Sequence, residues 1–409
     1  MNRDDKCSEQ RCMNEDDKCS ELRRVNGNDK LSEVHNKSDG GSKMKKGKWA
    51  AAFLLALTLV LGLTGCGAGG GKDAGASGSG KGNQTESAQT QTFTDSLGRE
   101  VELPKEIEKV APSGMMAQIM LYTLCPDRLC GLARDISVAE MEFVDQKYQD
   151  LPTFGNLYGS NANLNLESLM QAEPDVIIDI GEKKENMEQD LDGLQEQTGI
   201  PVIFIETTLP NMAEAYQTLG GLGLEPEQAK KLSVYCEETL SYAKEKAAQI
   251  PEKEKKTVYL AMGTSGLNTA AANSIHEDTL EMVGAVNVVE EEALGARAGE
   301  VSFEQLLVWQ PDYIFADSTS LKEEILGDGL WQDLDAVQNE QIYVIPDRPY
   351  SFMNSPPSVN RVVGIWWLGK MLYPDLYEVD VDEKIQEFYE LFYHVKLSED
   401  QLRNILNEN

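Results

Sequence analysis

The chain has 409 residues, of which 41% are apolar, and it carries a formal net charge of −32. This length exceeds what one hydrophobic core usually supports, so we expect two domains. The acidic balance excludes nucleic acid as a partner, because neutralising phosphates requires clustered Lys and Arg side chains. It suits a soluble protein outside the cytoplasm.

Residues 1–43 contain a short repeat, DDKCSE at residues 4–9, DDKCSE at 16–21 and NDKLSE at 28–33. The repeat has no apolar face to bury, so we expect this segment to be disordered. Met44 opens the next segment, and our hypothesis is that translation begins there, which would make residues 1–43 an artefact of gene-start assignment.

An apolar stretch from Trp49 to Leu63 follows Lys45, Lys46 and Lys48. It is shorter than the ~20 residues that a membrane-spanning helix needs, and it predicts a signal peptide over residues 44–65. Its end, LTGC at residues 63–66, resembles the bacterial lipobox, in which the cysteine is lipidated after the leader is removed. The resemblance implies that Cys66 anchors the chain to the membrane; the alternative is a truncated transmembrane helix with an incidental cysteine.

Residues 66–92 are rich in Gly, Ser and Gln, which predicts a flexible tether. From Phe93 onward, short β-branched runs alternate with amphipathic stretches, and this alternation predicts an α/β fold. The expected strands are Lys109–Ala111, Leu129–Leu132, Val176–Asp179, Val202–Glu206, Val258–Met262, Tyr313–Ala316 and Ile342–Ile345.

The chain contains one internal repeat, NLESLMQAEPDVII at residues 165–178 and SFEQLLVWQPDYIF at residues 302–315. Aligned without a gap, the copies match at Glu167/Glu304, Leu169/Leu306, Pro174/Pro311, Asp175/Asp312 and Ile177/Ile314. Each copy predicts a polar N-cap, a short helix, a proline-aspartate turn and a buried strand. Two lobes of like construction follow, over residues 93–226 and 251–409.

Residues 227–250 predict one long helix between the lobes, because apolar side chains recur every three or four residues. The expected stripe is Ala229, Leu232, Cys236, Leu240, Ala243, Ala247 and Ile250. At ~1.5 Å per residue the helix would run roughly 36 Å, enough to connect both lobes as a rigid strut. Such a strut limits how far the lobes can hinge.

The numbers and positions of the cysteines and histidines limit which disulfides and metal sites the chain can form. Outside the cytoplasm, Cys125 and Cys130 are compatible with either a disulfide or two free thiols. The chain has three histidines, and a bare transition metal normally recruits several His, Cys or carboxylate ligands, so a chelated metal or an oxyanion is favoured over a naked ion. His276 is a weak metal candidate, and the simpler interpretation is a surface residue at a helix start.

Several segments together resemble the class III substrate-binding proteins of ABC importers. They are FTDSLGREVELPKEIEKVA at residues 93–111, the twin segments, the long helix and WWLGKMLYPDL at residues 366–376. The resemblance extends from Phe93 to about Leu406. It implies two α/β lobes with mostly parallel sheets joined by one long interlobe helix. It also implies an ABC permease dimer with its ATPase as partners, and a metal complex as ligand, with no intrinsic cofactor and no catalysis.

In that family the ligand lies between the lobes at the carboxyl ends of the strands, where open α/β sheets generally bind ligands. The loops after the expected strands supply the candidate ligand-binding residues: Ser113, Met115, Met116, Asn156, Tyr158, Lys183, Thr264, Ser265, Asn268, Arg297, Arg348, Tyr350, Phe352 and Asn354. The last loop is rich in aromatic and cationic groups, which we expect to be exposed and able to stack on a planar ligand and pair with its oxygens.

Glu167 and Glu304 occupy equivalent places at the start of the two repeated helices. The helix dipole alone favours a glutamate in the first turn, by ~0.3–1 kcal/mol. The family resemblance implies in addition that the pair meets arginines of the permease dimer. We favour this docking role over a purely structural one.

Other classes of protein fit the sequence less well. The segment GTSGL at residues 263–267 misses the G-x-S-x-G pattern of a hydrolase by one residue, and an adhesin would not need a duplicated cleft architecture. The prediction is therefore a lipid-anchored extracytoplasmic receptor for an iron chelate, foremost a ferric siderophore. A corrinoid, haem or molybdate is the alternative ligand, and a surface hydrolase or adhesin is the alternative of another class.

Overall fold

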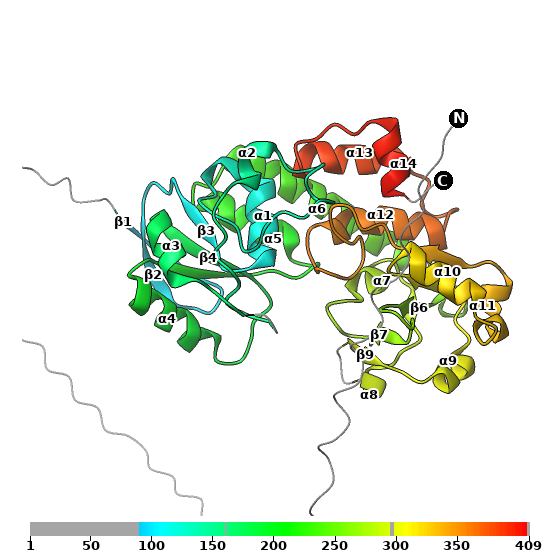
Figure 1. Ribbon diagram of the computed structural model, residues 1–409. Helices are drawn as coiled ribbons and strands as arrows, with labels where there is room; N and C mark the ends of the chain where they lie inside the picture. Colours follow the sequence, from blue (N-terminus) through cyan, green and yellow to red (C-terminus); the bar gives the residue numbers. More distant parts are fainter. Residues whose placement is uncertain (1–89, 160–161, 295–297, 407–409) are drawn as a thin grey trace, which may run out of the picture. The chain divides into compact units, whose positions relative to one another are not determined.

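The computed structural model of the chain describes residues 90–159, 162–294 and 298–406 (Figure 1). The chain divides into two units, residues 1–81 and 82–409, and the described residues all belong to the second. The predictions for the N-terminal extension, the signal peptide, Cys66, the tether up to residue 89 and Arg297 lie outside the described residues.

The N-terminal lobe is built on a parallel sheet of three strands in the order β3-β4-β5. An antiparallel hairpin precedes this sheet. The strands are β1 Thr90–Thr94, β2 Glu100–Pro104, β3 Val110–Pro112, β4 Val176–Gly181 and β5 Val202–Glu206, and the helices are α1 Met115–Leu124, α2 Gln146–Gln149, α3 Leu166–Ala172, α4 Met187–Thr198 and α5 Met212–Gly221.

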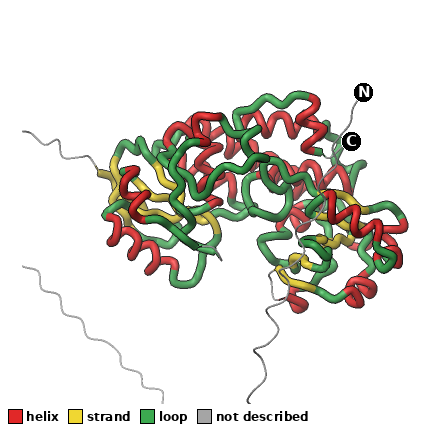
Figure 2. The backbone as a smooth tube through the Cα atoms, in the orientation of Figure 1, coloured by secondary structure: helices red, strands yellow, loops and turns green. Residues whose placement is uncertain are grey.

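The C-terminal lobe repeats this plan with four parallel strands in the order β11-β10-β6-β8 and a small antiparallel pair, β7 with β9. The strands are β6 Thr257–Ala261, β7 Asn268–Ala270, β8 Val286–Asn287, β9 Ala298–Glu300, β10 Tyr313–Ala316 and β11 Ile342–Val344. The helices are α7 Asp278–Met282, α8 Glu291–Leu294, α9 Phe303–Trp309, α10 Thr319–Gly327, α11 Asp335–Gln338, α12 Asn360–Leu372, α13 Val381–Phe392 and α14 Glu399–Ile405. Figure 2 shows the strands of the protein gathered into two groups.

Each parallel sheet is buried on both faces, as parallel sheets covered by helices usually are. In β4, Ile177 packs into an apolar cluster that belongs to the N-terminal lobe alone, whereas Ile178 faces a second, larger cluster. In β6, Tyr259 packs into a cluster of the C-terminal lobe, whereas Leu260 faces the same larger cluster. One continuous core therefore runs from one sheet to the other through residues of α1, α5, α6 and α12.

The predicted strut is α6, Pro226–Ala247, which begins one residue before and ends three residues before the predicted bounds. Its stripe is buried at Ala229, Leu232, Cys236 and Ala243, while Leu240 is partly exposed. With 22 residues it is roughly 33 Å long. The periodicity thus located the helix and most of its buried face.

Hydrogen bonds tie α6 to elements of both lobes. Gln217 of α5 donates from its amide to the hydroxyl of Ser233 at 2.8 Å. On the other side, the indole N–H of Trp366 in α12 donates to Thr239 Oγ1 at 3.1 Å. Gln228 donates to the backbone carbonyl of Leu391 in α13 at 2.8 Å. Together with the continuous core, these contacts oppose wide hinging of the lobes.

The repeat forms as predicted, with a short helix and then a buried strand in each lobe. Asn165 caps α3 by accepting from the backbone N–H of Ser168 at 3.1 Å. Ser302 caps α9 by accepting from Gln305 N at 3.3 Å, and the Gln305 side chain accepts in turn from Ser302 N at 3.0 Å. This reciprocal arrangement is a capping box.

The repeated aspartates perform a task that the sequence does not show. Asp175 accepts from the backbone N–H groups of Glu108 and Lys109, both at 2.8 Å, just before β3. Asp312 accepts from the N–H of Thr257, at the start of β6, at 2.9 Å. In each lobe, therefore, this carboxylate joins the beginnings of two neighbouring strands.

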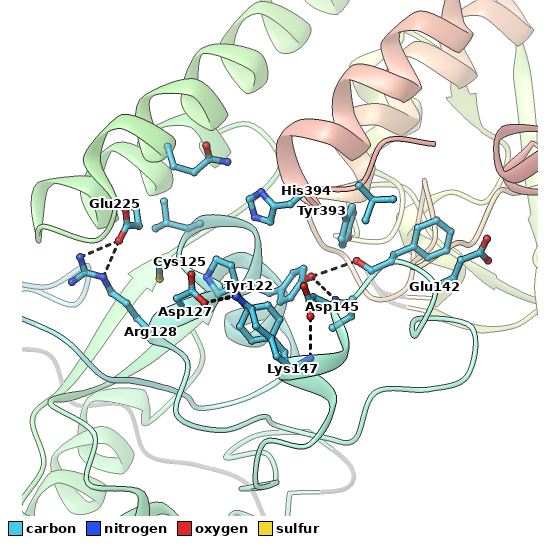
Figure 3. A pocket seen from close by; sticks show the side chains of 17 residues that line it. Tyr122, Cys125, Asp127, Arg128, Glu142, Asp145, Lys147, Glu225, Tyr393 and His394 are labelled. Atoms are coloured by element: carbon cyan, nitrogen blue, oxygen red, sulfur yellow. Dashed lines mark hydrogen bonds and ion pairs between the residues drawn. The ribbon is translucent and has the colours of Figure 1, made fainter. Parts of the chain in front are cut away.

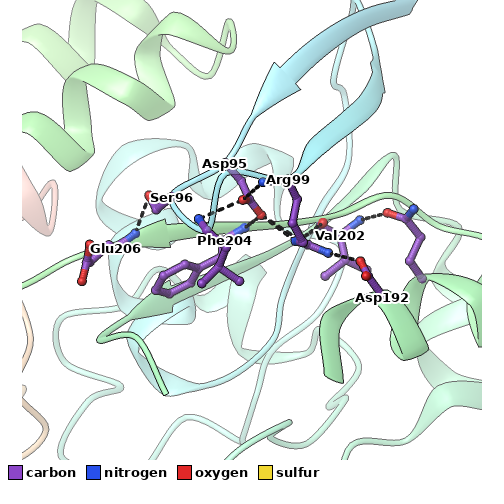
Figure 4. A network of polar contacts seen from close by, with 9 residues as sticks. Asp95, Ser96, Arg99, Asp192, Val202, Phe204 and Glu206 are labelled. Atoms are coloured by element: carbon purple, nitrogen blue, oxygen red, sulfur yellow. Dashed lines mark hydrogen bonds and ion pairs between the residues drawn. The ribbon is translucent and has the colours of Figure 1, made fainter. Parts of the chain in front are cut away.

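The segment DSLGR, residues 95–99, fastens the N-terminal hairpin to β5 (Figure 4). Arg99 donates to Asp95 Oδ2 at 2.7 Å, to Asp192 of α4 at 2.8 Å and to the carbonyl of Val202 at 2.7 Å. Ser96 N donates to the carbonyl of Phe204 at 3.0 Å. This part of the family-like opening sequence therefore has a structural role.

The predicted strand Leu129–Leu132 is wrong. Leu129 makes one isolated parallel bridge to Val110, and Leu132 makes another to Thr153. The Phe154 ring packs against Gly131, and the two bridges involve different partners, so no continuous ladder forms. The strands β1, β2, β7, β8 and β9 were not predicted. β7, β8 and β9 have only two or three residues each, whereas β2 alternates polar and apolar residues and carried a signal that the sequence analysis missed.

Cys125, Cys130 and Cys236 are free thiols. Burial raises the pKa of Cys125 to about 12 and that of Cys130 to about 11, so both remain protonated near neutral pH. Among the described residues, no three His, Cys, Asp or Glu side chains gather to hold a metal ion. No helix in the described ranges is long and apolar enough to cross a membrane.

Candidate functional site

A cavity of about 560 Å³ lies at the carboxyl end of the C-terminal sheet. Three neighbouring strands lead directly into its lining: β6 into Met262, β10 into Asp317 and β11 into Ile345. The lining carries five hydroxyl residues, Thr264, Ser318, Ser320, Ser351 and Ser355, and three carboxylates, Asp317, Glu324 and Asp347. Its position is the one at which open α/β sheets bind ligands.

Asp317 connects the loops that follow β6 and β10. Its Oδ2 accepts from the backbone N–H of Gly263 at 2.8 Å, and its Oδ1 accepts from the hydroxyl of Ser318 at 3.1 Å. Gly263 has φ +73°, a conformation that L side chains rarely adopt. The loop that carries Thr264 is thus held in a defined position beside the cavity.

The loop after β11 is fixed to β6 through Asn354, which is 4% exposed. The Asn354 carboxamide accepts from the hydroxyl of Ser351 and from the N–H of Ser355, both at 2.8 Å. Its Nδ2 lies 3.1 Å from the sulfur of Met262. Asn354 lines the cavity, but its carboxamide atoms are used in contacts within the protein that fix the shape of the loop.

The expectation that the aromatic side chains of this loop are exposed is wrong. Phe352 is completely buried, and its carbonyl packs against Gly364 of α12. Tyr350 is buried next to Tyr393, with 6.4 Å between ring centroids. Both rings remove a large apolar area from water, which stabilises the loop against the C-terminal helices. Neither offers a free face to a ligand in this structure.

Arg348, from the same loop, is half-exposed and lies 4.0 Å from the carboxylate of Glu142. Because Glu142 belongs to the N-terminal lobe, this is an ion pair between lobes. The remaining predicted residues of the C-terminal lobe lie nearer β6 and β7: Thr264 lines the cavity, while Ser265 and Asn268 are exposed beside it. The Ser265 hydroxyl accepts from Leu267 N at 3.3 Å.

The predicted residues of the N-terminal lobe meet at the carboxyl ends of β3 and β4. Ser113 is buried and donates its hydroxyl to Asp179 Oδ1. Its carbonyl accepts from Leu157 N at 2.8 Å, and Asn156 Oδ1 accepts from Met115 N at 3.2 Å. Met116 lies beside Met115 in the first turn of α1, partly exposed. These contacts bring the two loops together.

Tyr158 and Asp179 leave polar atoms unpaired in the same lobe. The Tyr158 hydroxyl and Asp179 Oδ2 are buried without a hydrogen-bond partner, and the ammonium of Lys184 lies 4.6 Å from the Tyr158 ring centroid. Burial raises the pKa of Asp179. Lys183 is exposed. Sequence reasoning missed Asp179, although an aspartate inside the apolar run VIIDI was a signal for it.

A charged cluster lies where the two lobes approach each other. Arg361 of α12 is 1% exposed and donates to Asp278 at 2.8 Å and to the carbonyl of Ile275 at 2.6 Å. Partial loss of hydration raises the pKa of Glu182, which follows β4 and remains exposed, and the negative charge of Asp278 adds to that shift. His276 Nδ1 lies 3.2 Å from the carbonyl oxygen of Asn354. His276 therefore contacts the loop backbone, and no metal-ligand set surrounds it among the described residues.

Glu277, next in sequence, provides a test of the electrostatics of this region. Its side chain is 6% exposed and accepts from Asn273 N at 2.9 Å, and burial raises its pKa from 4.5 to about 7. Because the folded pKa lies above the unfolded one, protonation contributes stability that is complete below pH 4.5 and lost as the pH rises through 7. Glu277→Gln should therefore stabilise the fold by about 2 kcal/mol at pH 8 and by little at pH 4.5.

Urea denaturation of both proteins at the two pH values measures this difference. Glu323→Gln, at an exposed position of α10 in the same lobe, is the matched control and should change stability little at either pH. A Glu277→Gln protein that is less stable than wild type at pH 8 would show that the carboxylate makes a favourable charged contact.

A second cavity of about 560 Å³ lies at the other end of α1, away from the strand carboxyl ends (Figure 3). Four of its charged side chains form two ion pairs: Arg128 with Glu225 at 3.0 Å, and Lys147 with Asp127 at 2.7 Å. These internal pairs leave little for a charged ligand to engage, so the cavity beside Asp317 is the better candidate site.

The two α/β lobes, the strut and a polar cavity at strand ends together define a two-lobed solute-binding protein. The family model of the periplasmic binding protein matches residues 145–349, half of the chain, and the chain belongs to that family. The vitamin B12-binding protein of Vibrio campbellii is 25% identical over 228 residues, which cover 54% of this chain and 76% of that protein.

Two further comparisons agree with this assignment. The Fe(3+)-citrate-binding protein YfmC of Bacillus subtilis is 25% identical over 190 residues, 45% of this chain and 58% of that protein. The solved structure of an ABC transporter solute binding protein from Sulfurospirillum deleyianum superposes with a TM-score of 0.70 and 29% identity, covering 77% of this chain and 99% of that one.

Proposed function

We propose that this protein is the extracytoplasmic receptor of an ABC importer, which captures a metal chelate between its lobes and delivers it to a permease. The observation that carries the proposal is the hydroxyl-rich cavity at the carboxyl ends of β6, β10 and β11 in a chain of this family. The ligands named for the relatives, vitamin B12 and Fe(3+)-citrate, support a metal complex, either a ferric chelate or a corrinoid.

Residues of both lobes would enclose the ligand. Thr264 and the Ser351 loop border it in the C-terminal lobe; in the N-terminal lobe, Asn156 and Tyr158 lie in the loop before α3, and Lys183 follows β4. Because a continuous core and α6 connect the lobes, we expect a largely preformed cleft with modest closure. Transport energy would come from the partner ATPase.

Glu167 and Glu304 are the proposed contacts with the permease. Both are exposed in the first turns of α3 and α9. Met170, three residues after Glu167, is 42% exposed, and Val308, four residues after Glu304, is 82% exposed. Side chains three or four positions apart share a helix face, so each glutamate lies beside an exposed apolar side chain. Such a mixed patch suits a protein interface.

The proposed anchor is a lipid on Cys66, with residues 67–89 as the tether; the predicted tether ran to residue 92, but Thr90, Gln91 and Thr92 belong to β1. Metabolic labelling of the expressing cells with a palmitate analogue tests it. We expect label on the wild-type protein and none on Cys66→Ala, and equal labelling of the two proteins would refute the anchor.

Ligand binding tests the proposed function itself. Trp331 packs against Gly266 in the loop that carries Thr264, so its fluorescence should change when the cavity fills. We expect one ferric or corrinoid chelate, from a panel that also contains haem and molybdate, to titrate this signal with one-to-one stoichiometry. Native mass spectrometry of the protein purified from iron-starved cells should show the same complex. Failure of every chelate to bind, or turnover of ester substrates, would overturn the proposal.

A further inference from the structure

The charge of the cavity beside Asp317 indicates which of the ligands named for the protein's relatives the cavity can accept. Three carboxylates line it, those of Asp317, Glu324 and Asp347, and no described lining residue is a Lys, Arg or His. The remaining polar lining consists of hydroxyl groups and the Asn354 carboxamide. The C-terminal half of the site is therefore negative wherever the structure describes it.

A helix N-terminus could in principle make such a site favourable for anions, because its free N–H groups carry partial positive charge. α10 begins at the cavity, but the Ser318 hydroxyl accepts from Leu321 N at 3.3 Å and donates to Asp317 Oδ1 at 3.1 Å. Asp317 also accepts the N–H of Gly263 at 2.8 Å. The Ser318 hydroxyl thus satisfies one of the free N–H groups of α10, and the Asp317 carboxylate, two residues before the helix, adds negative charge at this end.

The nearby arginines do not reverse this charge. Arg348 follows Asp347 in sequence, but its guanidinium lies 4.0 Å from Glu142. Arg361 is paired with Asp278 at 2.8 Å. Packing around Asp347 raises its pKa although the residue remains accessible to water; the positive charge of Arg348 opposes this shift, and the negative charge of Asp317 adds to it. The two carboxylates therefore lie close enough to repel each other.

From this arrangement we infer that the receptor selects neutral or cationic chelates that present hydrogen-bond donors, such as carboxamides or ammonium groups, to the C-terminal lobe. Polyanionic chelates and oxyanions are disfavoured on this side of the site, because they would add negative charge to a cavity that no described Lys, Arg or His lines. This inference rests on the proposed function and narrows it. It favours an amide-bearing corrinoid or a hydroxamate chelate over ferric citrate and molybdate.

Ligands of matched shape and different charge test the inference. The probes are aquacobalamin, a cation, against neutral cyanocobalamin, and ferrioxamine B, a cation, against its neutral N-acetyl derivative; ferric citrate and molybdate are the anions. Affinities are measured by fluorescence titration at low and high salt. We expect the cation to bind about fivefold more tightly than its neutral counterpart in at least one pair at low salt, with a smaller ratio at high salt. The anions should bind most weakly.

Asp347→Asn removes one charge from the cavity, and Glu323→Gln removes one from an exposed position of α10 outside it. The cation-to-neutral affinity ratio should fall about fivefold in Asp347→Asn and stay unchanged in Glu323→Gln; the ratio cancels any general loss of binding. Tight binding of an anion, or equal ratios in the two variants, would overturn the inference while leaving the receptor function intact. If no probe binds, the proposed function itself fails.

Discussion

A protein in which both Glu167 and Glu304 are replaced by alanine should bind its chelate with unchanged affinity but support no uptake by the cell. Both side chains are exposed, and neither lines the candidate cavity. Their helices keep their own caps, Asn165 for α3 and Ser302 with Gln305 for α9. The fold should therefore lose only the dipole contribution, about 0.3–1 kcal/mol for each glutamate.

The expected loss of uptake follows from two contacts being made at once. If each lobe presents one charge to one subunit of the permease, losing one contact leaves a weakened complex, and losing both removes the attachment. Each single variant should therefore retain reduced transport, and the double variant should show less than a tenth of wild-type transport. Uptake of labelled chelate by whole cells and fluorescence titration of the purified proteins are the two measurements.

A control of equal charge change separates docking from general electrostatics. Glu188 in α4 and Glu323 in α10 are exposed, one in each lobe, so Glu188→Ala with Glu323→Ala also removes two negative charges. We expect near-normal transport from this control. Loss of ligand affinity in the Glu167/Glu304 double variant would contradict the docking role, and so would equal transport defects in the two double variants.

Local patterns in the sequence were sufficient to predict the position of several helices and strands in each lobe. The period of three and four located α6, and the gapless repeat located α3 with β4 and α9 with β10. These predictions succeed because capping, periodicity and proline-aspartate turns act over a few residues. The role of Asp175, whose carboxylate accepts from the N–H groups of Glu108 and Lys109, 67 and 66 positions away in the chain, depends on the assembled sheet and leaves no local signal.

The site was less predictable than the fold, for two different reasons. Tyr350 and Phe352 follow a strand end as expected, but they are buried because the C-terminal helices cover the loop, and that contact joins distant segments. Asp317 and Ser318, in contrast, directly follow the predicted strand Tyr313–Ala316. Applying the strand-end rule there would have named both residues, so that omission was avoidable.

Gly364→Ala should destabilise the protein by about 3–5 kcal/mol and weaken chelate binding in the same variant. A Cβ at Gly364 would lie 1.8 Å from the carbonyl oxygen of Phe352 and 2.7 Å from its carbonyl carbon. Both are backbone atoms, so no side-chain rotation relieves the clash. α12 or the loop before it has to move, and α12 is packed on nearly every side by buried residues.

Movement of the loop before α12 should also weaken ligand binding. Ser351 and Asn354 line the cavity on either side of Phe352, and Asn354 reaches Met262 at 3.1 Å. A shift of Phe352 would therefore change the border of the cavity, and we expect affinity to fall at least tenfold in the folded fraction. Urea denaturation gives the stability, and fluorescence titration under native conditions gives the affinity.

Gly327→Ala is the matched control, because a Cβ there meets no atom within 4 Å and the residue ends a helix of the same lobe. It should leave affinity unchanged and stability within about 0.5 kcal/mol of wild type or slightly higher. If Gly364→Ala lost stability but kept full affinity, the Phe352 contact would serve the core alone. Loss of both in proportion would show that one backbone contact supports the core and the ligand site together, because the loop that borders the cavity is held in place by α12.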